Sequence, residues 1–98
     1  MTSEFDYATV AEVRKRAHSI NTTEFSDSDI EIIITGWENI MHKQKARTVV
    51  YPASIDLKIA KRAVVEGAAS EILLSFDDYI EDGKEAKSRY DSLIAILP

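Results

Sequence analysis

The sequence has 98 residues, of which 45% are hydrophobic and 30% are charged, a size and mixture typical of one globular domain. It contains no cysteine, which excludes disulfides, thiol nucleophiles and cysteine-based metal sites. Its apolar runs are only a few residues long, too short to span a membrane. We therefore expect a soluble intracellular chain that folds as a single helical domain over residues 1–98 and has no membrane contact.

Charge is distributed unevenly within the net charge of −5. Residues 1–40 carry three Lys or Arg and eight Asp or Glu, residues 41–65 carry six and one, and residues 66–98 carry three and eight. A basic middle therefore lies between two acidic ends. Copies of such a chain could pack basic edge on acidic edge, although an ordinary mixed and soluble surface is an equally good interpretation.

The first predicted helix begins at Thr9, because Thr9 and Glu12 form the Thr-x-x-Glu pattern of a capping box. We expect it to end near His18, before the turn residues at 21–23. The second helix begins at Ser26, where Phe25 and Ile30 have the spacing of a hydrophobic staple. Its apolar face comprises Ile30, Ile33, Ile34, Trp37, Ile40 and Met41.

Residues 46–53 break the helical pattern and are rich in β-branched and aromatic residues. They predict an extended arm or one short strand. A long third helix is expected from Ser54 to about Ile80, close to 40 Å at about 1.5 Å per residue. Asp82 and Gly83 would form its stop. A fourth helix should then occupy residues 84–97. The sequence thus predicts an all-α fold: a small bundle of about four helices with one long helix and an extended loop between helices two and three.

Two glycines lie inside predicted helices, where each costs about 1 kcal/mol relative to alanine. We assign Gly36, Ala60, Ala63 and Gly67 to close helix packing. The small residues near Gly67 would allow another helix to approach, either at a crossing within the chain or at a contact between subunits.

Catalytic chemistry is not indicated. His18 and His42 lie on different helices, have no ligand-spaced partner and are expected to be surface or cap residues. The acidic cluster at residues 77–82 is typical of a solvated helix end. A cation site is the alternative, but the cluster lacks the ligand pattern of an EF-hand. We therefore expect no enzymatic activity, no metal and no cofactor.

Four segments carry a resemblance to a known family. Tyr7–Val13 resembles a Tyr-x-Thr-x-x-(Asp/Glu)-(Val/Leu) start, and Ser26–Ile30 begins an Ile-rich helix. Tyr51–Ala60 contains a proline followed by Leu-Lys-x-Ala, and Arg89–Leu97 resembles a Tyr-x-x-Leu-Ile-x-x-Leu close. In this order and spacing, the sequence resembles the small helical head–tail connector proteins of tailed bacteriophages, also called adaptor or head-completion proteins.

The resemblance implies a structural virion protein without enzymatic activity. Copies would form a homo-oligomeric ring, dodecameric by resemblance, beneath the portal protein. The ring would join head to tail, allow non-specific passage of DNA through an extended channel, and bind a neck or tail-completion protein. The protein would reside in the virion neck, and in the host cytoplasm during assembly. The candidates for the subunit interface or channel are Lys43, Lys45, Arg47, Lys58, Lys61 and Arg62.

Two alternatives belong to other classes. A small helical partner-binding or regulatory protein would use its apolar stripe to bind another protein. A DNA-binding regulator of the helix-turn-helix type is disfavoured, because Asp27, Asp29 and Glu31 would lie at the DNA-facing start of the recognition helix.

Overall fold

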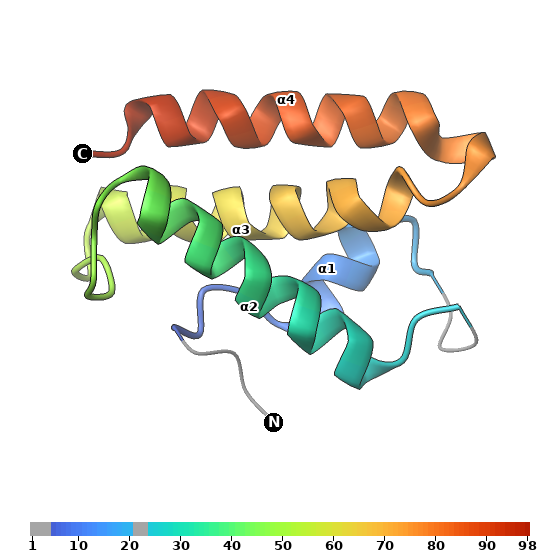
Figure 1. Ribbon diagram of the computed structural model, residues 1–98, viewed down its shortest axis with the longest axis horizontal. Helices are drawn as coiled ribbons and strands as arrows, with labels where there is room; N and C mark the ends of the chain where they lie inside the picture. Colours follow the sequence, from blue (N-terminus) through green and yellow to red (C-terminus); the bar gives the residue numbers. More distant parts are fainter. Residues whose placement is uncertain (1–4, 21–23) are drawn as a thin grey trace.

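The computed structural model describes residues 5–20 and 24–98, and these form an all-helical chain, as the sequence predicts. The elements in chain order are α1 (Val10–Arg16), α2 (Asp27–Gln44), α3 (Ile55–Leu73), the short 3-10 helix η1 (Asp77–Tyr79) and α4 (Ile80–Ile96) (Figure 1). The described ranges contain no strand, so residues 46–53 do not form the short strand that was one expectation for them.

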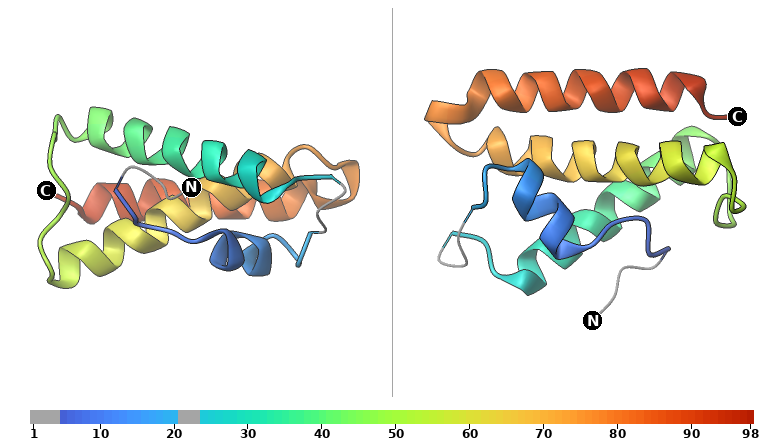
Figure 2. Two further views of the ribbon diagram at one scale, coloured as in Figure 1. Left: turned by 90° about the horizontal axis from the view of Figure 1, so that it is seen from below. Right: turned by 180° about the vertical axis from the view of Figure 1, so that it is seen from behind.

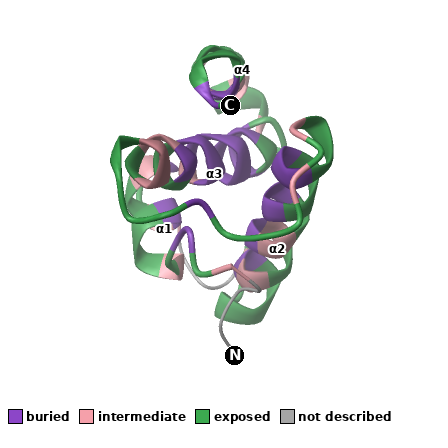
Figure 3. Cartoon of the chain, turned by 90° about the vertical axis from the view of Figure 1, so that its left-hand side faces the viewer, coloured by how far each residue is buried: buried purple, intermediate pink, exposed green. Residues whose placement is uncertain are grey.

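Helix α3 is the central element of the bundle. Helix α4 runs antiparallel beside it, and α1 and α2 pack on its other side (Figures 1 and 2). As a result, most of α3 is buried, whereas the outer sides of α2 and α4 remain exposed (Figure 3). The principal extents of the molecule are 35 × 29 × 19 Å.

Capping boxes fix the starts of α1 and α2. The backbone N–H of Glu12 donates to the Thr9 hydroxyl over 3.2 Å, and the Thr9 N–H donates to the Glu12 carboxylate over 2.9 Å. Ser26 and Asp29 form the same reciprocal pair at the start of α2. Each box satisfies two backbone donors that would otherwise have no partner in the helix. The predicted helix starts at Thr9 and Ser26 are confirmed.

The expected long helix over residues 54–80 is wrong only after Leu73. Helix α3 ends at Leu73, and the N–H groups of Ser75 and Phe76 bond back three residues, to Ile72 and Leu73, which tightens the last turn. Phe76 then adopts an extended backbone, and its ring makes an edge contact with Phe25 at 6.2 Å between centroids. The chain therefore turns after α3 where Phe76 packs on Phe25, although residues 74–79 contain no glycine or proline.

Gly83 is not a helix stop, and the fourth helix does not begin at residue 84. The glycine lies inside α4, which begins at Ile80. A Cβ at Gly83 would approach the Leu74 side chain to 2.7 Å and the Leu74 backbone nitrogen to 3.0 Å. The glycine therefore permits the start of α4 to lie close against the end of α3.

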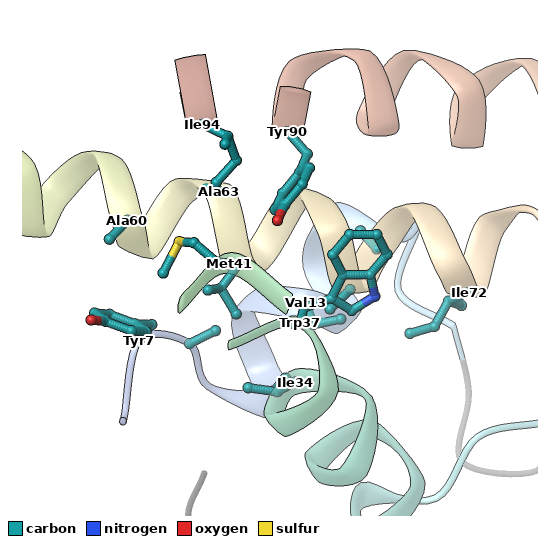
Figure 4. Packing of buried hydrophobic residues seen from close by; sticks show 14 of the residues in the cluster. Tyr7, Val13, Ile34, Trp37, Met41, Ala60, Ala63, Ile72, Tyr90 and Ile94 are labelled. Carbon is teal, nitrogen blue, oxygen red and sulfur yellow. The ribbon is translucent and has the colours of Figure 1, made fainter. Parts of the chain in front are cut away.

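The core is formed where α2, α3 and α4 meet (Figure 4). Trp37 of α2 lies in an edge contact with Tyr90 of α4, with 4.8 Å between ring centroids. Its indole N–H donates to Glu71 of α3 over 2.9 Å, so the one polar atom of this side chain is satisfied. The labelled residues around it are Val13, Ile34, Met41, Ala60, Ala63, Ile72 and Ile94.

Candidate interaction surfaces

The six basic candidates lie toward one end of the molecule, on the last turn of α2, in residues 45–54 and on the first two turns of α3 (Figure 1). Four of them are exposed: Lys43, Lys58, Lys61 and Arg62. Lys45 is half-buried. Within residues 5–20 and 24–98, none of these five side chains forms an ion pair. This end of the chain therefore carries basic side chains that make no direct ion pair with the described residues, although Lys61 and Arg62 line a small hollow together with Glu12 and Glu66.

Arg47 differs from the other basic candidates. Its guanidinium lies over the Tyr51 ring, 4.0 Å from the centroid, and donates to the backbone carbonyls of Val49 and Val50. It is half-buried and holds the segment between α2 and α3 in shape. Its contacts therefore indicate a structural role, and they leave little of the side chain for a neighbouring subunit or a channel.

A buried carboxylate anchors the N-terminal segment beneath this loop. Glu38 of α2 is 0% exposed, and its two oxygens accept the backbone N–H groups of Phe5 and Tyr7 at 3.2 and 3.0 Å. Asp6, between these two donors, has a left-handed backbone with φ of 55°. That conformation lets two backbone donors converge on one carboxylate.

His42 was expected to be a surface or cap residue, and the surface alternative is wrong because His42 belongs to the same buried cluster. It is 4% exposed, and its ring stacks on Phe5 at 4.1 Å. Its Nδ1 lies 3.1 Å from the Arg47 carbonyl, which can only accept, so Nδ1 carries the proton. Nε2 then accepts from the Tyr7 hydroxyl over 2.8 Å. The Tyr7 oxygen in turn accepts the N–H of Tyr51 over 3.0 Å.

Burial affects both tyrosines of the cluster. It raises the pKa of the Tyr7 phenol, and it raises the pKa of the Tyr51 phenol as well. The Tyr51 hydroxyl donates to the backbone carbonyl of Pro98, which ties the loop to the end of the chain. The cluster therefore joins four separate segments through buried, hydrogen-bonded groups.

Sequence reasoning missed this cluster, although a signal for it exists. Ile34, Glu38 and His42 recur every four residues and so share one side of α2. Ile34 belongs to the apolar stripe that packs into the core. Residues 38 and 42 lie on the same side of α2 and are therefore buried with it. A second missed residue is Glu66 of α3, which is buried and accepts from Arg16 of α1 at 3.0 Å.

The small residues of α3 take part in close packing within the chain. Ala60 and Ala63 are fully buried. A Cβ at Gly67 would meet the Trp37 ring at 2.5 Å, so the glycine is what allows the indole to lie this close to α3. Gly36 does not fit this assignment within the chain: it is exposed, and a Cβ there would meet no atom within 4 Å.

Acidic residues gather toward the opposite end, on the first turn of α2, in η1 and at the start of α4 (Figure 1). Two contacts link these elements to α1 and the turn after it: the ion pair of Arg14 with Asp27 at 2.7 Å, and a hydrogen bond between His18 Nε2 and Asp82 at 2.8 Å. A groove of about 750 Å³ lies here between α1 and the first two turns of α2. Its lining includes Glu31.

In the part of the chain that the structure describes, no cluster of three or more His, Cys, Asp or Glu residues is placed to hold a metal ion. Within the same part, every helix is too short or too polar to cross a bilayer. In comparisons with known proteins, the sequence matches no family model, and neither a curated protein nor a solved structure gives a match.

Proposed function

We propose that the protein is a structural subunit of a bacteriophage neck. Copies would form a ring beneath the portal protein, join head to tail and extend the channel through which DNA passes without being read. The ring, dodecameric by resemblance, would also bind a neck or tail-completion protein. It would act in the virion after assembly in the host cytoplasm, without catalysis and without a cofactor.

One observation carries the proposal: the two ends of the molecule differ in charge. Unpaired basic residues lie on one end, and acidic elements lie on the other. A ring built head to tail requires two different patches on each subunit, and patches of opposite charge would attract each other. The resemblance of the sequence to head–tail connectors supplies the setting in which such a ring would work.

The basic residues of α3 are the most informative to change. Lys58, Lys61 and Arg62 are exposed on its first two turns. They would meet acids of the neighbouring subunit or face the channel, where they would contact DNA phosphates. Both roles depend on charge and should weaken as salt is raised.

The test is the double variant Lys61→Glu with Arg62→Glu. Sedimentation velocity across a salt series and electron microscopy would compare its assembly with that of the unchanged protein, alone and with portal particles. We expect weaker assembly or weaker retention of DNA. The matched control is Lys84→Glu with Arg89→Glu, which makes the same change of charge on exposed residues of α4. If the Lys61/Arg62 variant assembles as well as the control, the proposal is wrong.

The partner-binding alternative has one observation in its favour. The apolar stripe of α2 is largely covered, because Ile30, Ile34 and Met41 are buried. However, Ile32 and Ile40 on the outer side of the helix are 66% and 43% exposed. A protein that stays monomeric and binds one unrelated partner through these residues would support this alternative.

A further inference from the structure

The outer face of α2 carries a stripe of five exposed residues that the fold leaves uncovered: Asp29, Ile32, Gly36, Ile40 and Lys43. The successive spacings are three, four, four and three residues, which follow the helical repeat of about 3.6 and keep the five on one side of the helix. The pattern is symmetric about Gly36. This outer stripe faces away from α3 (Figure 3).

Gly36 has no function inside the chain that explains its presence. Glycine weakens a helix interior relative to alanine. Gly67 and Gly83 have a compensating role, because a Cβ at either position would collide with Trp37 or Leu74. At Gly36 a Cβ would meet nothing within 4 Å. A glycine between two exposed isoleucines is a place where a second helix can approach closely.

The charges of the stripe are arranged so that it complements itself. Asp29 lies seven residues before Gly36, and Lys43 lies seven residues after it. If a second α2 lay antiparallel with its Gly36 on the first, each Ile32 would meet the other copy's Ile40. Each Asp29 would likewise meet the other copy's Lys43. Both ion pairs and both apolar contacts form together only in this antiparallel register.

We propose that the outer stripe of α2 binds a second copy of this chain, with the two helices antiparallel about a two-fold axis through Gly36. The contact is isologous and closes after two subunits. One helix pair buries less than the roughly 1,200–2,000 Å² of a standard stable interface, so the dimer is weak and reversible. This inference goes beyond the proposed ring. Lys43 is also a ring candidate, but the ring is tested at Lys61 and Arg62 of α3, which lie outside the outer stripe.

Charge exchange between two chains tests the register. Lys43→Glu alone and Asp29→Lys alone each create two like-charge contacts across the axis, and each should weaken dimerisation by about tenfold or more. Mixed together, the two variants restore both ion pairs, and heterodimers should form at the affinity of the unchanged protein. Sedimentation equilibrium over a concentration series measures all four samples. Lys84→Glu, on an exposed residue of α4, is the matched control and should not alter the dimer.

Cysteine cross-linking provides a second measurement, since Asp29 also belongs to the capping box of α2 and its replacement removes that hydrogen bond. The chain has no cysteine, so Gly36→Cys introduces a single thiol on the two-fold axis. Under mild oxidation this variant should form a disulfide-linked dimer much faster than Ser88→Cys, an exposed position on α4. A two-fold axis brings the same residue of both copies together, as a disulfide requires.

The outcomes separate the two proposals. Restoration in the mixture together with fast cross-linking at residue 36 supports the dimer. If the unchanged protein is monomeric at high concentration, or if its association is unaffected by both charge variants and residue 36 does not cross-link, the dimer is overturned. Loss of assembly in the Lys61/Arg62 variant with an intact dimer would support the ring independently.

Discussion

Both faces of α2 carry isoleucines and charged residues, but the two faces use them differently. On the inner face, Trp37 packs against Gly67, and Glu38 accepts two backbone donors from the N-terminal segment. On the outer face, Ile32 is largely exposed, and Gly36 has open space above it. The inner face is fully occupied by contacts within the chain, whereas the outer face has apolar and charged residues that the chain itself does not use.

This difference shows that residue type does not identify a contact surface by itself. A glycine within a helix costs the same conformational free energy on either face. The glycine is needed for the fold only where neighbouring atoms leave no room for a Cβ. Substitutions on the inner face should therefore change the free energy of unfolding, and substitutions on the outer face should mainly change association between chains.

The largest effect is expected at Glu38. Glu38→Ala leaves the part-buried N–H group of Phe5 and the buried N–H group of Tyr7 without an acceptor, and it should lower the free energy of unfolding by about 3 kcal/mol. Glu38→Gln keeps one acceptor oxygen and should cost clearly less. Urea denaturation followed by circular dichroism measures both. Equal losses in the two variants would show that the lost hydrogen bonds are not the cause.

Alkaline pH provides the second test of the inner face. Burial raises the pKa of Tyr90 to about 12, and its hydroxyl donates to Gln44 at 2.5 Å. In the unfolded chain the phenol loses its proton near pH 10, whereas the folded chain keeps it until about pH 12. The folded state therefore binds more protons in this window, and stability should fall as pH rises through it, by up to about 2 kcal/mol.

Tyr90→Phe isolates that effect. The variant loses the hydrogen bond to Gln44, about 1 kcal/mol at neutral pH, and should also lose the part of the decline above pH 10 that Tyr90 causes. The parts caused by Tyr7 and Tyr51, whose pKa values burial also raises, should remain. Tyr79→Phe changes an exposed tyrosine and is the control. Urea denaturation at several alkaline pH values gives the comparison. An unchanged pH profile in Tyr90→Phe would assign the alkaline loss to other groups.

The third substitution is Gly67→Ala. The added methyl group would approach the Trp37 ring to 2.5 Å, so the indole must move from its contact with Tyr90. Strain of this kind costs about 1–3 kcal/mol, and the better helix propensity of alanine returns about 1 kcal/mol. We expect a net loss of up to about 2 kcal/mol by thermal denaturation. A gain in stability would mean that the crossing of α2 and α3 can widen without penalty.

Much of the fold follows from local signals in the sequence. The caps at Thr9 and Ser26 set two helix starts, because their hydrogen bonds involve residues only three positions apart. The end of α3 could not be predicted in this way. It depends on Phe76 meeting Phe25, a contact between residues far apart in the chain. The role of Gly83 could not be predicted either, because it also depends on a tertiary contact. Gly83 resembles a helix stop in the sequence, but in the structure it allows α4 to pack closely against Leu74.

The candidate surfaces were predicted less completely than the fold. Composition placed the basic residues in one block, and the fold keeps that block at one end. The sequence composition could not distinguish Arg47 from Lys43. Arg47 lies over the Tyr51 ring and donates to two backbone carbonyls, whereas Lys43 is exposed. The composition also could not separate Gly36 from Gly67, because that distinction depends on where Trp37 lies.

The smallest and most diagnostic change is Gly36→Ala. No atom lies within 4 Å of the added methyl group, so alanine should stabilise α2 by about 1 kcal/mol and raise the unfolding midpoint. This gain is opposite in sign to the loss expected for the same substitution at Gly67. In a two-fold dimer the two new methyl groups would meet across the axis, so association should weaken while the monomer becomes more stable. Thermal denaturation and sedimentation on the same preparation measure both quantities. A more stable monomer with unchanged association would leave the outer face without a partner at this position.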